Sequence, residues 1–249
     1  MTAADCANPS NCPVPDPGSL DLSRLGVVRP RPMSFYSAYR AQCWPAVFNP
    51  GHGDTRFAPL HAADGSAVPT LFGGAMKTVA LLESIFHEVH ATGARVISRS
   101  IDLAQWGLVE LSSVGPLALI DLSDAALIGL GLVRPDGAAA RERLVDTGPG
   151  HYACTRVSAE HLHALGAIDG ELPVGICWQS RIAELAASGA PLLEDLLNVE
   201  NTSVFILFGD RVSTDVDDYA IAEHYRDLAA DDAGGLLVAI GEQLGAVIL

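Results

Sequence analysis

The run TSVFILFG, residues 202–209, indicates the fold class more clearly than any other stretch. Its aliphatic and aromatic side chains carry no charge and end at a glycine, which is typical of a strand buried on both faces. Strand-like composition recurs in residues 34–40, 95–102, 108–112, 117–122 and 174–178. Helical spacing is predicted for residues 79–93, for residues 158–165 with Ser158 as the cap, and for part of the tail after residue 219. Because strands outnumber helices without strict alternation, we expect an α+β fold with mixed or antiparallel sheets and flanking helices.

The chain has 249 residues and neither an internal repeat nor a long linker, so we expect one compact domain. Residues 1–32 are rich in Pro, Asn, Asp, Gly and Ser, and such a segment buries too little apolar surface to offset its ordering entropy. We predict an extended or disordered arm over residues 1–32 and the domain over residues 33–249. Hydrophobic residues make up 49% of the chain, yet no apolar run reaches the roughly 18 residues of a membrane span.

Charge and cysteine content exclude several classes of protein. Lys and Arg number 15 against 30 Asp and Glu, and the resulting net charge of −15 disfavours binding to nucleic acid. The N-terminus lacks the basic start and apolar stretch of a secretory signal. The five cysteines match neither a disulfide framework nor a four-thiolate zinc site. We therefore expect a cytoplasmic protein with no membrane or nucleic-acid contact and no metal.

Five short motifs follow one another in a fixed order. None of them is diagnostic alone, because an Arg after Tyr, a Glu within a helix and a Ser before Arg are all common. They are Tyr39-Arg40, Arg56-Phe57 with a proline two residues on, Leu71–Ala75 (LFGGA), Leu81-Leu82-Glu83, and Gly175–Arg181 (GICWQSR). In this order they closely resemble the pattern of the RES-domain family, named for its Arg, Glu and Ser. The resemblance spans roughly residues 34–209.

The resemblance implies a compact fold related to ADP-ribosyltransferases, with NAD⁺ bound as a substrate in a cleft. Family members that act as toxins degrade NAD⁺, and an Xre-type antitoxin protein opposes them. Arg40, Glu83 and Ser180 correspond to the three signature residues, and Arg56 corresponds to a second basic position. Phe72 stands where many members have Tyr, so the resemblance implies no hydroxyl at that position.

These residue types fit the chemistry of NAD⁺ cleavage. Breaking the nicotinamide–ribose bond builds positive charge on the ribose, which a fixed carboxylate, here Glu83, would stabilise. Arg40 and Arg56 are predicted to bind the pyrophosphate, because guanidinium groups bond phosphate oxygens in pairs. Ser180 is predicted to hydrogen-bond a ribose hydroxyl or the carboxamide. Stacking on a base or on nicotinamide is predicted for Tyr39 and Phe72.

Three alternatives concern the reaction itself. The acceptor of the ribosyl group is phosphate, water or a protein side chain. Phosphorolysis is favoured, because the resemblance implies it and because Arg56 and Arg181 are available to hold inorganic phosphate as a co-substrate. ADP-ribosylation of a protein target is the second hypothesis. A catalytically silent NAD-binding or interaction module is the third, and it requires Glu83 to be exposed and remote from Arg40.

Without the motif order, the same residues have simpler explanations. Arg40, Arg56 and Glu83 would be interpreted as ion-pairing residues, and Tyr39 and Phe72 as core residues. Glu83, His87 and His90 share one face of the predicted helix and would allow a metal site, although their spacing is not that of the HExxH motif. The oligomeric state stays open, with a homo-oligomer among the alternatives.

Overall fold

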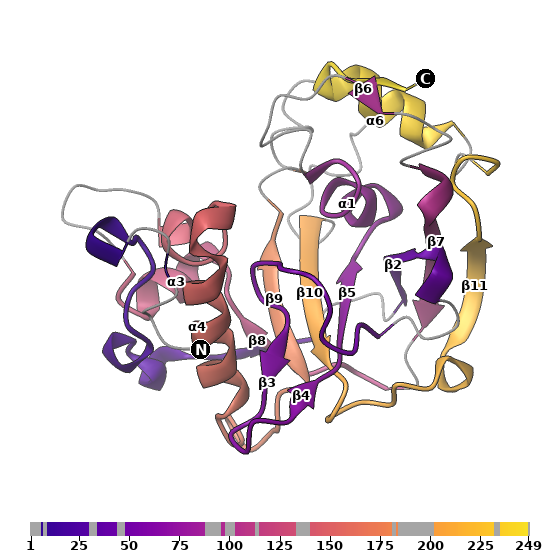
Figure 1. Cartoon of the computed structure of the whole chain (residues 1–249). Coiled ribbons are helices and arrows are strands. Elements are labelled where there is room, and N and C mark those ends of the chain that lie inside the picture. Colours follow the sequence, from indigo (N-terminus) through magenta and orange to yellow (C-terminus); the bar gives the residue numbers. More distant parts are fainter. Residues whose placement is uncertain are drawn as a thin grey trace.

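A computed structural model describes residues 6, 9–29, 34–43, 48–87, 96–97, 103–112, 115–132, 140–180, 183, 202–231 and 235–248 of the chain. Its main feature is an eight-stranded sheet in the order β1-β8-β9-β10-β5-β2-β7-β11 (Figure 1). The strands are β1 (Val27–Val28), β8 (Leu119–Asp121), β9 (Gly175–Gln179), β10 (Ser203–Phe208), β5 (Thr70–Gly74), β2 (Ser34–Arg40), β7 (Trp106–Ser112) and β11 (Ala220–Tyr225).

All neighbouring pairs in this sheet are antiparallel except β8 and β9, which are parallel. Two small sheets accompany it: β12 (Val247–Ile248) pairs in parallel with β6 (Val96–Ile97), and β3 (Leu60–His61) pairs antiparallel with β4 (Ala67–Val68). The described helices are α1 (Lys77–Leu82), α3 (Asp124–Gly129), α4 (Tyr152–His163) and α6 (Leu236–Leu244). The predicted α+β class with a mixed sheet is confirmed. None of the described helices is long and apolar enough to cross a membrane.

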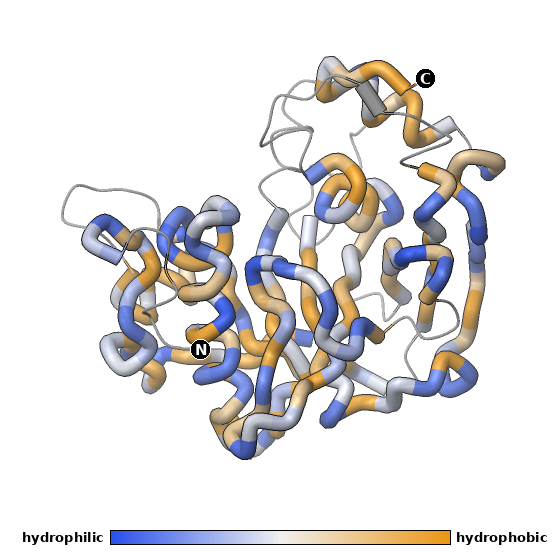
Figure 2. Tube along the Cα trace, in the orientation of Figure 1, coloured by the Kyte–Doolittle hydropathy of each residue, from blue (hydrophilic) through white to orange (hydrophobic). Residues whose placement is uncertain are grey.

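The central strand β10 explains why both faces of the sheet are covered. All six of its residues are buried. Val204, Ile206 and Phe208 contribute to the larger hydrophobic cluster with side chains of α1, α4 and α6, whereas Phe205 and Leu207 pack in a second cluster on the opposite face. A strand buried on both faces needs apolar residues at successive positions, as the run 202–209 predicts. Figure 2 shows hydrophobic segments along the central strands and in α6.

The described part of residues 1–32 is packed against the rest of the chain. It contains three short 3₁₀ helices, at Pro9–Asn11, Pro17–Ser19 and Leu22–Arg24, and its strand β1 pairs with β8. Cys6, Val14, Leu20 and Leu25 are buried in the larger cluster. These four buried side chains lie outside the three turns and anchor the described part of the segment to the core, whereas the sequence predicted an extended or disordered arm. The boundary at residue 33 stays a prediction.

Two predicted helices begin or end elsewhere. Helix α1 ends at Leu82, and Glu83 is its C-terminal cap instead of a mid-helix residue. Helix α4 begins at Tyr152, after a 3₁₀ turn at Pro149–His151, so that Ser158 lies inside the helix, where its hydroxyl donates to the Cys154 carbonyl at 3.4 Å. A serine hydroxyl can bond backbone groups at a helix cap or a carbonyl of the preceding turn inside a helix. The sequence alone does not distinguish these two positions.

Candidate active site

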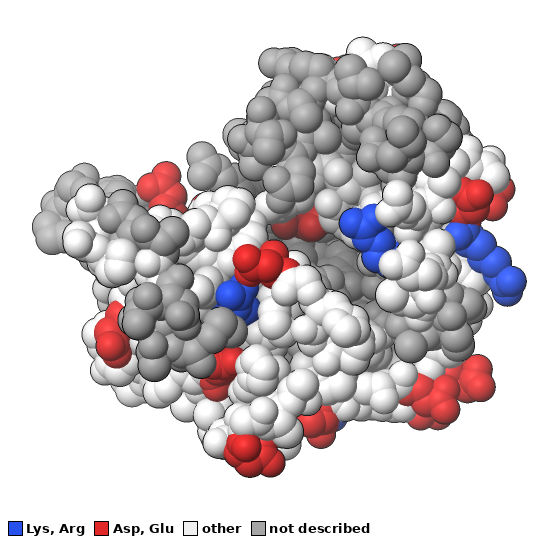
Figure 3. Space-filling model, in the orientation of Figure 1, with Lys and Arg blue, Asp and Glu red and all other residues white. Residues whose placement is uncertain are grey.

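A cavity opens where the main sheet splits. β2 pairs with β7 along its whole length, but its pairing with β5 is recorded at a single position, Tyr36 opposite Gly74. Beyond that pair, the end of β2 and the start of β5 line a cavity of about 600 Å³, within the size range of small-molecule sites. Figure 3 shows a hollow near the middle of this face with acidic and basic side chains around it. Side chains from distant segments line it, among them Arg40, Arg56, Thr70, Phe72, Glu83, Trp106, Tyr152 and Trp178.

Glycine at position 74 lets α1 approach the sheet at this split. A Cβ atom on Gly74 would lie 2.7 Å from the backbone nitrogen of Ala80. Since real Cβ atoms do not approach backbone that closely, any larger residue would push α1 away from β5. Helix α1 delivers Glu83 at its C-terminal end, so this contact sets the position of the carboxylate relative to β5.

Glu83 is held by Ser180. The Ser180 hydroxyl donates a hydrogen bond to Glu83 Oε1 at 2.5 Å and accepts one from the backbone N–H of Ala183 at 3.0 Å. Ser180 follows β9 directly and is fully buried, whereas Glu83 is half-buried and lines the cavity. Ser180 is not among the residues that line the cavity, and its hydroxyl already bonds Glu83, so it lies behind the carboxylate, where it can position it. The contact between Ser180 and a ribose hydroxyl or the carboxamide stays a prediction.

We expect Ser180→Ala to lower the rate of the predicted NAD⁺ cleavage about tenfold, because Glu83 loses the hydrogen bond that fixes one of its oxygens. The substitution also leaves the buried Ala183 N–H without its acceptor, which costs about 1–3 kcal/mol of the free energy of unfolding. Turnover under saturating substrate and urea denaturation measure the two effects separately. Ser158→Ala is the matched control, since Ser158 is equally buried but lies within α4. Equal turnover in Ser180→Ala and the unmodified protein would contradict the positioning role.

The two arginines differ in their surroundings. Arg40 is exposed at the end of β2, where its guanidinium lies 4.2 Å from the centre of the Trp106 ring and donates to Gln105 Oε1 at 3.3 Å. Arg56 is half-buried, and its Nε atom is buried without a hydrogen-bond partner among the described residues. Both line the same cavity as Glu83. The structure thus brings Arg40, Arg56 and Glu83 to one cavity. Arg40 is exposed and stacked on Trp106, whereas Arg56 is half-buried.

Thr70 is a second polar group in this cavity with an unused atom. Its Oγ1 is buried and has no hydrogen-bond partner among the described residues, and its side chain is 1% exposed. A buried polar atom left without a partner costs about 1–3 kcal/mol, and native structures contain few of them. Arg56 and Thr70 both line the cavity, although these two atoms are themselves covered by protein.

The aromatic side chains separate by strand alternation. Phe72 lines the cavity, and its ring meets that of Trp178 edge-on at 6.4 Å. Tyr39 precedes Arg40 on β2, so the two side chains point to opposite faces of the sheet. The Tyr39 ring is 5% exposed within the opposite cluster, and its hydroxyl lies 2.6 Å from His224 Nε2. Burial raises the pKa of the Tyr39 phenol, which keeps it neutral.

Tyr39 is also among the residues that line the cavity, but it is only 5% exposed, so little of its ring is free, and its stacking stays a prediction. Trp106 and Trp178 line the cavity too, and the sequence prediction missed both. Trp106 lies directly opposite Arg40 in the β2–β7 register, so a prediction of that strand pairing would have found it. Cross-strand partners of this kind share one face of a sheet and interact.

Helix α4 supports the wall that carries Arg56. The Thr155 hydroxyl donates to the Arg56 carbonyl, and Arg156 pairs with the carboxylate of Asp54. Tyr152, the first residue of α4, itself lines the cavity. The loop bearing Arg56 is thus tied to α4 on two sides.

Two predicted residues lie outside the described part of the chain: Arg181, the spare cation for phosphate, and His90, the third member of the alternative metal set. His87 lines the cavity together with Glu83. Among the described residues, these two do not belong to a group of three side chains close enough to bind one metal ion. Among the described residues, Glu83 and His87 therefore do not form the alternative metal site, and His90 lies outside the described part of the chain.

No protein-family model matches the chain, and no curated protein matches it. Among solved structures, a chain in the crystal structure of the M. tuberculosis MbcT–MbcA toxin–antitoxin complex is similar, with 13% sequence identity and a TM-score of 0.47. The similarity covers 90% of this chain and 94% of that chain. We take no conclusion about activity or partners from this likeness.

Proposed function

We propose that this protein cleaves the nicotinamide–ribose bond of NAD⁺ and transfers the ribosyl group to inorganic phosphate. The observation that carries the proposal is the meeting of a positioned carboxylate, Glu83, with two guanidinium groups around one cavity. A dinucleotide needs this combination, because its reacting ribose becomes cationic while its pyrophosphate is anionic. The order of motifs that resembles the RES-domain family supports the same conclusion.

Glu83 acts on the reacting carbon in this proposal. As the bond to nicotinamide breaks, nicotinamide leaves with the bonding electrons and the ribose becomes oxocarbenium-like. A carboxylate already held by Ser180 stabilises that charge without having to reorganise. An oxygen of phosphate then forms the new bond at the anomeric carbon, giving ADP-ribose 1-phosphate.

The arginines bind the anionic part of the substrate. The guanidinium of Arg56, a half-buried residue of the cavity lining, is a donor for a pyrophosphate oxygen in a protein whose net charge of −15 otherwise repels anions. Arg40 stacks on Trp106 at the cavity rim, where its cation is available to a second anion such as the incoming phosphate. Phe72 offers apolar ring surface against nicotinamide or adenine, and Trp178 packs edge-on against it.

We expect nicotinamide release by the purified protein to require inorganic phosphate. The measurement is nicotinamide formation from NAD⁺ in a phosphate-free buffer and in the same buffer with added phosphate, with sulfate at equal ionic strength as the control. Release that is indifferent to phosphate would select water as the acceptor. Adenine label that appears on a protein would select ADP-ribosylation, and the absence of any release would favour a silent binding module.

We propose further that the activity is that of a toxin-type protein, as the motif resemblance implies, with an Xre-type antitoxin as partner. Expression of the intact chain in a bacterial host is then expected to lower cellular NAD⁺ and arrest growth. Glu83→Gln expressed at the same level should leave both unchanged. Growth arrest by the Glu83→Gln chain would show that any toxicity comes from another property of the protein.

A further inference from the structure

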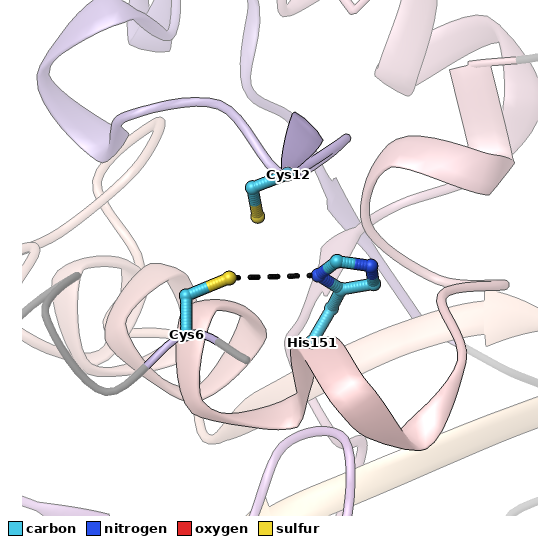
Figure 4. Close-up of side chains that lie close together, drawn as sticks. All are labelled: Cys6, Cys12 and His151. Atoms are coloured by element: carbon cyan, nitrogen blue, oxygen red, sulfur yellow. Dashed lines mark hydrogen bonds between the residues drawn. The ribbon is translucent and has the colours of Figure 1, made fainter. Parts of the chain in front are cut away.

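Three cysteines and one histidine, two of them from the N-terminal segment and two from the middle of the chain, meet beside the start of α4. Cys6 and Cys12 belong to the N-terminal segment, His151 immediately precedes α4, and Cys154 lies in the first turn of that helix. Figure 4 shows the side chains of Cys6, Cys12 and His151 pointing toward one another. This cluster is separate from the cavity around Glu83, and none of the proposed NAD⁺ chemistry uses it.

Three of the four donor atoms are close enough together for one tetrahedral metal ion. The ligand atoms of Cys6, Cys12 and His151 all lie within 4.8 Å of one another, and Cys6 Sγ is 3.6 Å from His151 Nδ1. Cys154 does not belong to this group of three, but its Sγ lies 3.5 Å from Cys12 Sγ, so it is the nearest candidate for a fourth ligand and would close in on the ion when it binds. Bonds of about 2.3 Å from zinc to sulfur and about 2.0–2.1 Å to nitrogen place tetrahedral ligands about 3.8 Å (S to S) and 3.6 Å (S to N) apart.

We propose that Cys6, Cys12, His151 and Cys154 bind one zinc ion in a structural site. Thiolates and imidazole are the ligands that zinc prefers, whereas magnesium and calcium require oxygen. Four protein ligands leave no open position for a substrate, which is the arrangement of a structural and not a catalytic site. On binding, the three thiols release their protons to solvent and the imidazole binds through Nδ1.

A zinc ion explains the whole cluster better than a disulfide does. A disulfide between Cys12 and Cys154 would account for only two of the four side chains and would not explain why Cys6 lies beside His151. None of the five cysteines forms a disulfide in the structure. The absence of a four-thiolate pattern in the sequence does not conflict with the site, because its fourth ligand is a histidine.

The proposed ion joins the N-terminal segment to the element that supports the candidate active site. Residues 6 and 12 would be tied to the first turn of α4, and the same helix holds the Arg56 loop through Thr155 and Arg156. Loss of the ion is therefore expected to loosen both the N-terminal segment and that wall of the cavity.

The metal content of the full chain tests the proposal. The protein is expressed in zinc-supplemented medium and purified with a non-thiol reductant, and zinc and free thiols are counted by elemental analysis and by thiol titration after denaturation. We expect about one zinc per chain and five free thiols once the metal is chelated. Cys12→Ser and Cys154→Ser should lose the zinc, while Cys43→Ser and Cys177→Ser, which change cysteines outside the cluster, should keep it.

A second measurement keeps the test valid if a ligand variant fails to fold. Cobalt(II) replaces zinc in the unmodified chain, and its visible spectrum should show tetrahedral coordination with thiolate charge transfer. His151→Cys should retain the metal and intensify that charge transfer. A folded, reduced chain that binds no zinc, zinc retained by Cys12→Ser, a Cys12–Cys154 disulfide, or bound iron and sulfide would each overturn the proposal.

Discussion

Glu83→Gln is expected to lower the turnover of NAD⁺ by about 100-fold or more, with little change in the affinity for NAD⁺. The amide keeps the size of the side chain and can still accept the Ser180 hydrogen bond at its oxygen. What disappears is the negative charge beside the developing oxocarbenium ion, and the loss of one preorganised electrostatic partner costs about 2.7–4 kcal/mol in comparable sites. Nicotinamide release at saturating substrate and equilibrium binding of NAD⁺ measure the two quantities.

Glu142→Gln is the control for Glu83→Gln. It removes one negative charge from an exposed residue of the 3₁₀ helix Ala140–Arg143, away from the cavity lining. We expect its turnover to equal that of the unmodified protein. If Glu83→Gln also kept full turnover, the carboxylate would have no part in the reaction and the proposed mechanism would be wrong.

Arg56→Ala is expected to weaken NAD⁺ binding by about 10- to 100-fold. Hydrogen bonds to charged groups contribute about 1.5–3 kcal/mol, and each 1.4 kcal/mol is a factor of ten in affinity. Arg56 is the better candidate for this effect than Arg40, because it is a half-buried residue of the cavity lining, while the Arg40 guanidinium is exposed and stacked on Trp106. Equilibrium binding of NAD⁺ by calorimetry measures the change.

Three variants make the Arg56 result specific. Arg56→Lys keeps the charge but not the paired donors, so we expect an intermediate affinity. Arg40→Ala is expected to weaken binding by no more than about fivefold, as for an exposed charge. Arg29→Ala removes an exposed ion pair with Glu171 outside the cavity and should change nothing. Normal affinity in Arg56→Ala would remove Arg56 from the binding site, and a larger loss in Arg40→Ala would exchange the two roles.

Local patterns predicted much of the fold. The uncharged run 202–209 is strand β10, and residues 34–40 are strand β2 with the same bounds. Strands of this kind can be predicted because a strand buried on one or both faces needs apolar side chains at fixed intervals, whatever packs against it. The ends of helices were less predictable. Helix α1 stops at Leu82, and no nearby glycine or proline marks that position in the sequence.

The motif order also indicated which residues meet. Arg40, Arg56, Phe72 and Glu83 come from four segments, and all of them line one cavity. The direction of each side chain was a separate question. Alternation along β2 places the Arg40 and Tyr39 side chains on opposite faces of the sheet, and the Tyr39 ring packs in the second cluster although the residue also borders the cavity. The hollow itself arises from the divergence of β2 and β5, which neither strand encodes alone.

The sequence by itself determined an acidic α+β chain with a buried central strand, and it indicated three charged residues that line one cavity. Only the tertiary structure decided that Ser180 lies behind Glu83 and not in the cavity, and that Cys6 and Cys12 meet His151 and Cys154. Periodicity reports the neighbours of a residue within its own element. Contacts between segments about 140 residues apart, as between Cys12 and Cys154, depend on how the elements pack, because the chain between them is long enough to permit many arrangements.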